Sequence, residues 1–109
     1  MEQVIEVEIT QLYFSHARVR PRFSGSAQTL LDTLTLLKTG GLPTLPAITV
    51  VRLPDSRLVS LNNRRLWVWK ELLREQPERR RVFARVRDAT AAEAKRLRGD
   101  LSLRARVVL

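Results

Sequence analysis

The sequence has 109 residues, of which 44% are hydrophobic and 28% charged, and this balance predicts one domain with a packed core and excludes a disordered chain. Because it contains no cysteine, it excludes a disulfide scaffold, a thiolate metal site and cysteine catalysis. Twenty Lys and Arg against eleven Asp and Glu give a net charge of +9, which predicts affinity for polyanions.

The first part of the chain predicts a strand, a turn and a helix. Residues 4–9 alternate apolar with acidic side chains, as a half-buried strand does. A turn-like stretch follows over residues 15–26. Ser26 is the expected N-cap of an amphipathic helix whose leucines recur every three or four residues, and Gly40 and Gly41 end that helix.

The middle of the chain predicts a hairpin and a second helix. The β-branched run 48–51 indicates a buried strand, and residues 58–61 form its short antiparallel partner. One of the two asparagines at 62–63 then caps a helix with an apolar stripe. Trp69 falls within that stripe, whereas Trp67 falls at its edge, where an indole ring can stack on a base.

The last part of the chain predicts a strand and a short helix. Residues 82–87 alternate in a way that gives a strand one basic face, and the capping box at 90–93 opens a helix that stops at Gly99. Residues 88–109 are therefore expected to be a helix followed by an edge strand or an arm. The order of elements predicts a small, single-domain α+β fold with a mixed sheet and about three helices over residues 1–109.

The positive charge is concentrated in residues 64–87, where nine cations stand against three carboxylates, a net charge of +6. Such a basic face is either a docking surface for nucleic acid, an acidic protein or an anionic membrane, or simply a solvated face. The arginines of the candidate polyanion patch are Arg74, Arg79, Arg80, Arg81, Arg85 and Arg87.

Several other classes of protein are excluded or disfavoured. No run approaches the ~20 apolar residues of a membrane span, and the glutamates near the start have the wrong charge for a targeting peptide. We therefore expect a soluble, intracellular protein. Neither common nucleotide-binding glycine loop is present. The sole histidine, His16, cannot form a metal cluster and is expected to be a surface or packing residue, so no metal site is predicted.

The densest group of candidate binding residues is the segment 60–65, Ser-Leu-Asn-Asn-Arg-Arg, where a strand is expected to end and a helix to begin. Unpaired N–H groups and a partial positive charge at a helix N-terminus favour a phosphate there. The guanidinium groups of Arg64 and Arg65 add forked donors, while Asn62 and Asn63 add neutral ones. The alternative interpretation is an ordinary asparagine cap followed by two solvated arginines.

Three short motifs occur in a characteristic order between residues 4 and 87. They are Arg20-Pro21-Arg22 before the first helix, Gly41-Leu42 leading into Pro46-Ala47-Ile48-Thr49-Val50, and Asn62-Asn63-Arg64-Arg65 at the second helix. In this arrangement the chain resembles the ParB/sulfiredoxin superfamily. The resemblance implies a phosphate-binding pocket in which Arg64 and Arg65 hold phosphate and Arg20, Arg22 and Gly41 lie nearby. Thr29 and Thr33 fall at places similar to those of hydroxylated residues in sulfiredoxin-type members, and the resemblance implies that they line the pocket.

The chain also departs from that superfamily. Asn63 stands where sulfiredoxins have their cysteine and ParB proteins a glutamate, so sulfinic acid reduction is excluded. No helix-turn-helix segment follows, so operator recognition of the ParB kind is not expected. The resemblance implies ATP, CTP or a nucleic-acid backbone as ligand. The alternatives are a nuclease or phosphate-transferring enzyme, with Mg²⁺ held by Asp32, Glu71 or substrate groups, and a basic interaction module with a non-functional pocket.

Overall fold

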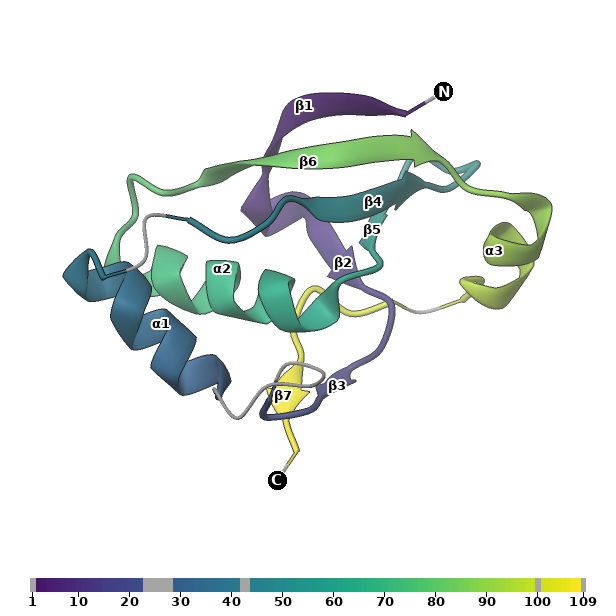
Figure 1. Cartoon of the computed structure of the whole chain (residues 1–109). Helices are drawn as coiled ribbons and strands as arrows, with labels where there is room; N and C mark the ends of the chain where they lie inside the picture. Colours follow the sequence, from purple (N-terminus) through teal and green to yellow (C-terminus); the bar gives the residue numbers. More distant parts are fainter. Residues whose placement is uncertain (1, 23–28, 42–43, 100, 109) are drawn as a thin grey trace.

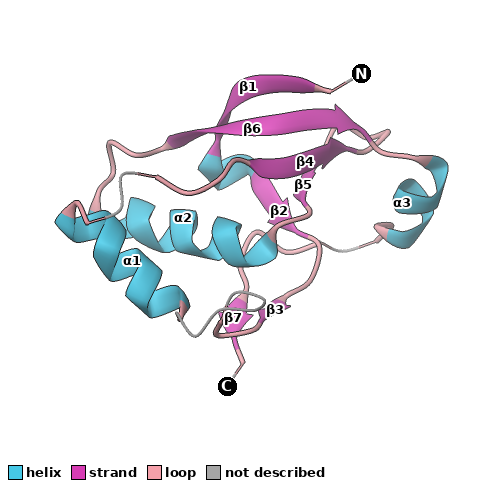
Figure 2. Ribbon diagram, in the orientation of Figure 1, coloured by secondary structure: helices cyan, strands magenta, loops and turns pink. Residues whose placement is uncertain are grey.

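A five-stranded mixed sheet forms the centre of the fold (Figures 1 and 2), and the computed structural model describes residues 2–22, 29–41, 44–99 and 101–108. The strand order is β1-β6-β4-β5-β2, in which β1 pairs antiparallel with β6, β6 parallel with β4, β4 antiparallel with β5, and β5 parallel with β2. The strands are β1 (Gln3–Glu8), β2 (Leu12–Phe14), β4 (Ile48–Arg52), β5 (Leu58–Ser60) and β6 (Arg81–Asp88).

Helices α1 (Leu30–Thr39) and α2 (Asn63–Glu75) cover one face of this sheet (Figure 1). The main hydrophobic core lies between these helices and the sheet. It contains the fully buried Ile48 and Val50 of β4 and Leu66 and Leu72 of α2. The apolar stripe predicted for the second helix is confirmed, with Trp69 buried in this core and Trp67 only partly buried.

The N-cap of helix α1 lies three residues after the position expected for it. Thr29 is the N-cap: its hydroxyl accepts a hydrogen bond from Asp32 N (3.0 Å), and the Asp32 carboxylate accepts one from Thr29 N (3.0 Å). The expected cap, Ser26, lies outside the described residues. The predicted end is confirmed, because Gly40 adopts a φ of 81° as the C-cap.

The other face of the sheet carries a smaller apolar cluster beside α3 (Ala91–Arg96). Val51 and Val59 of the β4–β5 hairpin pack there with Leu97, the residue that follows α3. The predicted capping box is confirmed, because the hydroxyl of Thr90 accepts a hydrogen bond from Glu93 N. Helix α3 therefore closes only the hairpin end of this face and leaves most of β1 and β6 uncovered.

Three short strands, near the beginning and the end of the chain, differ from the sequence-based expectations. The stretch expected to be a turn contains β3 (Arg18–Val19), which pairs in parallel with β7 (Arg106–Val107) in a second, two-stranded sheet. The end of the chain is thus a strand, but not an edge strand of the main sheet. Strand β2, which sequence reasoning missed, follows the 3-10 turn η1 (Ile9–Gln11).

Strand β1 lies at one edge of the main sheet, which changes the burial expected for it. Of the three side chains expected on its buried side, Val7 and Ile9 are buried, and Ile9 belongs to η1. Ile5 is instead 36% exposed, because neither helix reaches this part of the edge strand. The α+β class and the hairpin over β4 and β5 are confirmed.

Candidate functional site

A hollow of about 400 Å³ opens at the N-terminus of α2, beside β3. Of the described residues, four arginines, one histidine and two asparagines contribute to its lining, and no carboxylate does. We call it the arginine pocket; its lining residues are His16, Arg18, Val19, Arg20, Leu61, Asn62, Asn63, Arg64 and Arg65.

One wall of the arginine pocket is the extended segment around β3. This segment contributes His16, which lies in the bend before β3, and Arg18, Val19 and Arg20 to the lining. Val19 is buried, and the backbone bonds from Arg106 N to Ala17 O and from Val108 N to Val19 O hold the segment in place. The sequence analysis did not assign His16 and Arg18 to the site. Their positions shortly before Arg20 in the sequence are the signal that could have identified them.

The opposite wall of the pocket begins with Asn62, the N-cap residue of α2. Its side chain does not cap the helix. Instead, Asn62 Oδ1 accepts a hydrogen bond from Thr49 N (2.6 Å), and Asn62 N donates one to Ser60 Oγ (3.0 Å). The residue therefore fixes the start of α2 against β4 and β5, and no side chain at the N-cap position covers the first N–H groups of the helix.

The two arginines of the segment fasten α2 to neighbouring loops through backbone carbonyls. Arg64 Nη1 donates a hydrogen bond to the carbonyl of Arg22 (2.7 Å), and Arg65 Nη1 donates one to that of Ala47 (3.2 Å). Because a guanidinium carries five N–H donors, the bond to Ala47 leaves Arg65 with donors for a ligand. The side chains of Arg18 and Arg20 make no hydrogen bond or ion pair with any residue that the structure describes.

The structure brings together some of the predicted site residues and separates others. Arg20 lies in the pocket with the segment 62–65, and the backbone of Arg22 contacts Arg64. The hydroxyl of Thr29 is engaged in the α1 cap, and Thr33 is buried, with its hydroxyl donating to the carbonyl of Thr29 (3.2 Å). Neither threonine lines the arginine pocket.

Gly41 lies at the opposite end of the α1–α2 pair from the arginine pocket. Near the end of α1, Lys38 forms an ion pair with Glu75 (2.8 Å), so the C-terminal ends of the two helices are adjacent (Figure 1). Gly41 follows α1 directly, whereas the pocket lies at the start of α2. The next residue of that motif, Leu42, lies outside the described residues.

The candidate polyanion patch on β6 is partly neutralised by the neighbouring strand. Antiparallel pairing sets Glu8 of β1 opposite Arg81 and Glu6 opposite Phe83. Arg81 Nε lies 2.8 Å from Glu8 Oε1, and this hydrogen bond raises the pKa of the Arg81 guanidinium. The glutamates of β1 are far from β6 in the sequence, so the net charge counted for residues 64–87 omits them. That count is therefore larger than the net charge of this face.

Further arginines of the patch have partners of their own. Arg87 forms a double hydrogen bond with Glu93, at 2.7 and 2.9 Å, and Arg74 Nη1 lies 3.5 Å from Glu71 Oε1. The patch thus divides into paired arginines and a remainder. Of the six arginines of the patch, Arg79, Arg80 and Arg85 form no ion pair with a residue that the structure describes.

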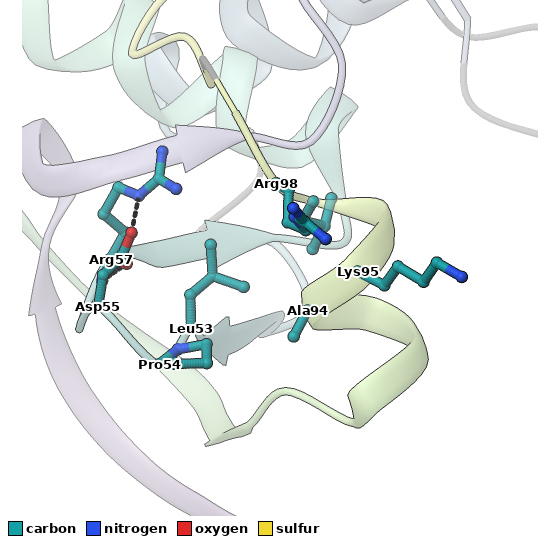
Figure 3. Close-up of a pocket in the computed structure, with 8 residues that line it drawn as sticks. Leu53, Pro54, Asp55, Arg57, Ala94, Lys95 and Arg98 are labelled. Carbon is teal, nitrogen blue, oxygen red and sulfur yellow. Dashed lines mark hydrogen bonds and ion pairs between the residues drawn. The ribbon is translucent and has the colours of Figure 1, made fainter.

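A third group of residues forms a hollow of about 460 Å³ between α3 and the turn after β4 (Figure 3). Here Arg57 is already engaged: its Nε contacts the Asp55 carboxylate (2.8 Å), and its Nη1 donates to the carbonyl of Gly99 (2.9 Å). In Figure 3 the side chain of Lys95 extends away from Asp55 and Arg57. These contacts serve to fasten α3 to the hairpin.

The described residues contain no group of three or more His, Cys, Asp or Glu side chains that could hold a metal ion. Asp32 is committed to the cap of α1, and Glu71 faces Arg74. In the same part of the chain, no helix is long and apolar enough to cross a membrane.

No model of a known protein family matches this chain, and no curated protein matches it. The resemblance to the ParB/sulfiredoxin superfamily therefore stays a prediction from three short motifs. The arrangement of the arginine pocket is independent of that resemblance, because it follows from the positions of the side chains themselves.

Proposed function

We propose that this domain binds the phosphate groups of a nucleoside triphosphate or of a nucleic-acid backbone in the arginine pocket. The observation that carries the proposal is the lining itself, in which four arginines and a helix N-terminus converge without a carboxylate. Several arginines elsewhere in the structure pair with carboxylates, as Arg81 does with Glu8 and Arg57 with Asp55. An unbalanced cluster of guanidinium groups is favourable once an anion enters it.

The roles of the residues follow from their contacts. Arg20 and Arg18 supply guanidinium groups from one wall, and Arg65 supplies its remaining donors from the other. Asn62 and Asn63 act indirectly, since their amides hold α2 and the neighbouring loops in register. The volume of about 400 Å³ is in the range of small-molecule sites.

Binding, rather than hydrolysis, is the activity that these residues support. Among the residues that the structure describes, the lining offers neither a carboxylate ligand for Mg²⁺ nor a carboxylate base. Asp32 and Glu71, the carboxylates that a nuclease would have used, both lie outside the lining.

The test is a titration of the protein with fluorescent ATP and CTP analogues and with a labelled single-stranded oligonucleotide at physiological salt. Arg20→Gln removes one pocket guanidinium that has no partner among the described residues, and Arg98→Gln removes an exposed arginine remote from the pocket. We expect Arg20→Gln to weaken binding about tenfold or more, in line with the loss of a charge-assisted hydrogen bond, and Arg98→Gln to leave it nearly unchanged.

The two sources of phosphate are separated by competition. If inorganic triphosphate displaces the nucleotide while the oligonucleotide does not bind, the ligand is a nucleotide; tight oligonucleotide binding with weak nucleotide binding identifies a nucleic-acid backbone. Equal losses in Arg20→Gln and Arg98→Gln, or no saturable binding of any probe, would overturn the proposal.

A further inference from the structure

A further cavity, of about 550 Å³, lies between one side of α2 and the segment 103–105 near the end of the chain. It shares no lining residue with the arginine pocket. Phe14 and Trp67 contribute aromatic rings to its wall, and Lys70, Arg74 and Arg104 contribute cations. Its volume is that of a site for a small organic molecule.

Helix periodicity brings the α2 side chains together in this cavity. Trp67, Lys70, Glu71 and Arg74 stand at spacings of three and four residues and therefore share one side of the helix. The residues directed to the core, such as Leu72, lie on another side. The cavity is thus lined by a side of α2 at the margin of the core, where Trp67 and Leu73 are only partly buried.

Lys70 is the polar centre of this side. Its side chain is partly buried, its Nζ donates a hydrogen bond to the carbonyl of Leu103 (2.6 Å), and it lies 5.3 Å from the centroid of the Phe14 ring. No carboxylate of the described chain lies within ion-pair distance of it. Glu71, the acidic residue in the lining, instead faces Arg74 at 3.5 Å.

The ammonium group of Lys70 therefore lacks a counter-charge. Burial lowers its pKa to about 8, because the carbonyl and the ring replace only part of the lost hydration. Arg104, across the cavity, is exposed, and its side chain makes no hydrogen bond or ion pair with a described residue. An anion that enters between these two cations would supply the charge that the protein does not.

Apart from the hydroxyl of Thr10 and the charged side chains, the described wall is largely apolar. Trp67 is partly buried and packs at the margin of the main core, and Leu73, Leu103 and Ala105 add aliphatic surface. Such a surface favours a flat, apolar group, and an indole ring is suited to offset stacking on another ring.

We propose that this cavity is a binding site for a small aromatic anion, whose ring lies against Trp67 and whose carboxylate or phosphate faces Lys70 and Arg104. The site is separate from the arginine pocket and does not depend on the function proposed for it. Its ligand differs in chemistry, because it needs an apolar ring as well as one anionic group.

The experiment uses 1-naphthoate as the probe, with 1-naphthalenemethanol as the uncharged counterpart and cyclohexanecarboxylate as the non-aromatic one. Binding is followed by the amide and indole signals in ¹H–¹⁵N NMR spectra of the whole chain. We expect saturable changes in the signals of Trp67 and Leu103 with naphthoate. The other two compounds should bind at least tenfold more weakly, because each of them lacks one of the two favourable contacts.

Matched variants identify the residues that carry the binding. Lys70→Met removes the ammonium and keeps the length of the side chain, and Lys95→Met makes the same change on the exposed side of α3. We expect naphthoate to bind about tenfold more weakly to Lys70→Met and equally to Lys95→Met. Arg104→Gln, at an exposed position, is a second variant whose fold is not at risk, and it is expected to weaken binding severalfold.

A direct readout comes from the lysines themselves, because the chain has only three of them. After reductive ¹³C-methylation each amine gives its own NMR signal, and we expect naphthoate to raise the pKa of Lys70 alone. Equal binding of naphthoate and 1-naphthalenemethanol, equal losses in Lys70→Met and Lys95→Met, or an unchanged Lys70 pKa would overturn the proposal.

Discussion

The carboxamide of Asn63 holds Ser15 at two points: Asn63 Oδ1 accepts a hydrogen bond from Ser15 N (3.1 Å), and Asn63 Nδ2 donates one to Ser15 Oγ (2.9 Å). The two residues are 48 positions apart in the sequence. This pair joins the first turn of α2 to the loop after β2, and so fixes the two walls of the arginine pocket relative to each other.

Substitutions at Asn63 should separate stability from phosphate binding. Asn63→Ala removes both hydrogen bonds and is expected to lower the free energy of unfolding by about 1 to 3 kcal/mol. Asn63→Asp keeps acceptors for Ser15 N and the Ser15 hydroxyl, so its stability should stay within about 1 kcal/mol of the wild type. Its added negative charge should weaken phosphate binding about tenfold. Urea unfolding and nucleotide titration measure the two effects, and a strong loss of stability in Asn63→Asp would contradict this view of the pair.

The pairing of Glu93 with Arg87 predicts a dependence of stability on pH. The Arg87 side chain and the backbone N–H of Thr90 lower the pKa of Glu93 to about 2, against 4.5 for a free glutamate. The stabilisation is therefore complete above pH 4.5 and is lost as the pH falls through about 2. Glu93→Gln should cost about 1.5 kcal/mol at pH 7 and nothing near pH 2. Urea unfolding across this range tests it, with the exposed Glu78→Gln as control.

Lys70 predicts a change of stability in alkaline solution. Because burial lowers its pKa from 10.5 to about 8, the unfolded chain binds more protons than the folded one between these values, and stability should rise with pH through that window. Because the ammonium group is only partly buried and solvent screens its charge, the full effect is expected to be about 1 to 2 kcal/mol. Lys70→Met should lack this rise, whereas Lys95→Met should retain it. Parallel slopes for wild type and Lys70→Met in urea unfolding at pH 7.5 to 10.5 would refute the buried-ammonium assignment.

Strand β1 is expected to suppress non-specific polyanion binding by β6. Glu8→Gln removes the partner of Arg81 and should steepen the log–log salt dependence of DNA binding by about 0.9, the value for one additional phosphate contact. Glu78→Gln makes the same change in net charge without touching either strand. If both variants change the slope equally, the effect belongs to net charge and not to the pairing of the two strands.

Local sequence patterns predicted the elements whose signals are local. The alternation in β6 between inward-facing residues such as Ala84 and outward-facing ones such as Arg85, the capping box at Thr90 and the stop at Gly40 each lie within a few residues. In each case the physical cause, either side-chain alternation or a cap, acts over one turn or one strand. These predictions therefore needed no knowledge of the rest of the chain.

The missed elements depend on distant partners. Strand β2 has only three residues and is defined by parallel pairing of Leu12 with Leu58, and β3 exists through its pairing with β7. The same reason explains the charge pattern, since Glu8 and Arg81 are 73 positions apart in the sequence. At the candidate site, segment 62–65 was evident as a cluster, whereas the wall around Arg18 was not.

The last described residues of the chain support both proposed binding sites, the arginine pocket and the cavity beside α2. Leu103 and Arg104 form a wall of the cavity beside α2, and two residues later β7 holds β3 in place against the arginine pocket. A short C-terminal truncation would therefore abolish binding of two unrelated ligands together. Such a result in deletion mapping would indicate one composite site where there are two, so only single substitutions at Arg20 and Lys70 can assign the ligands separately.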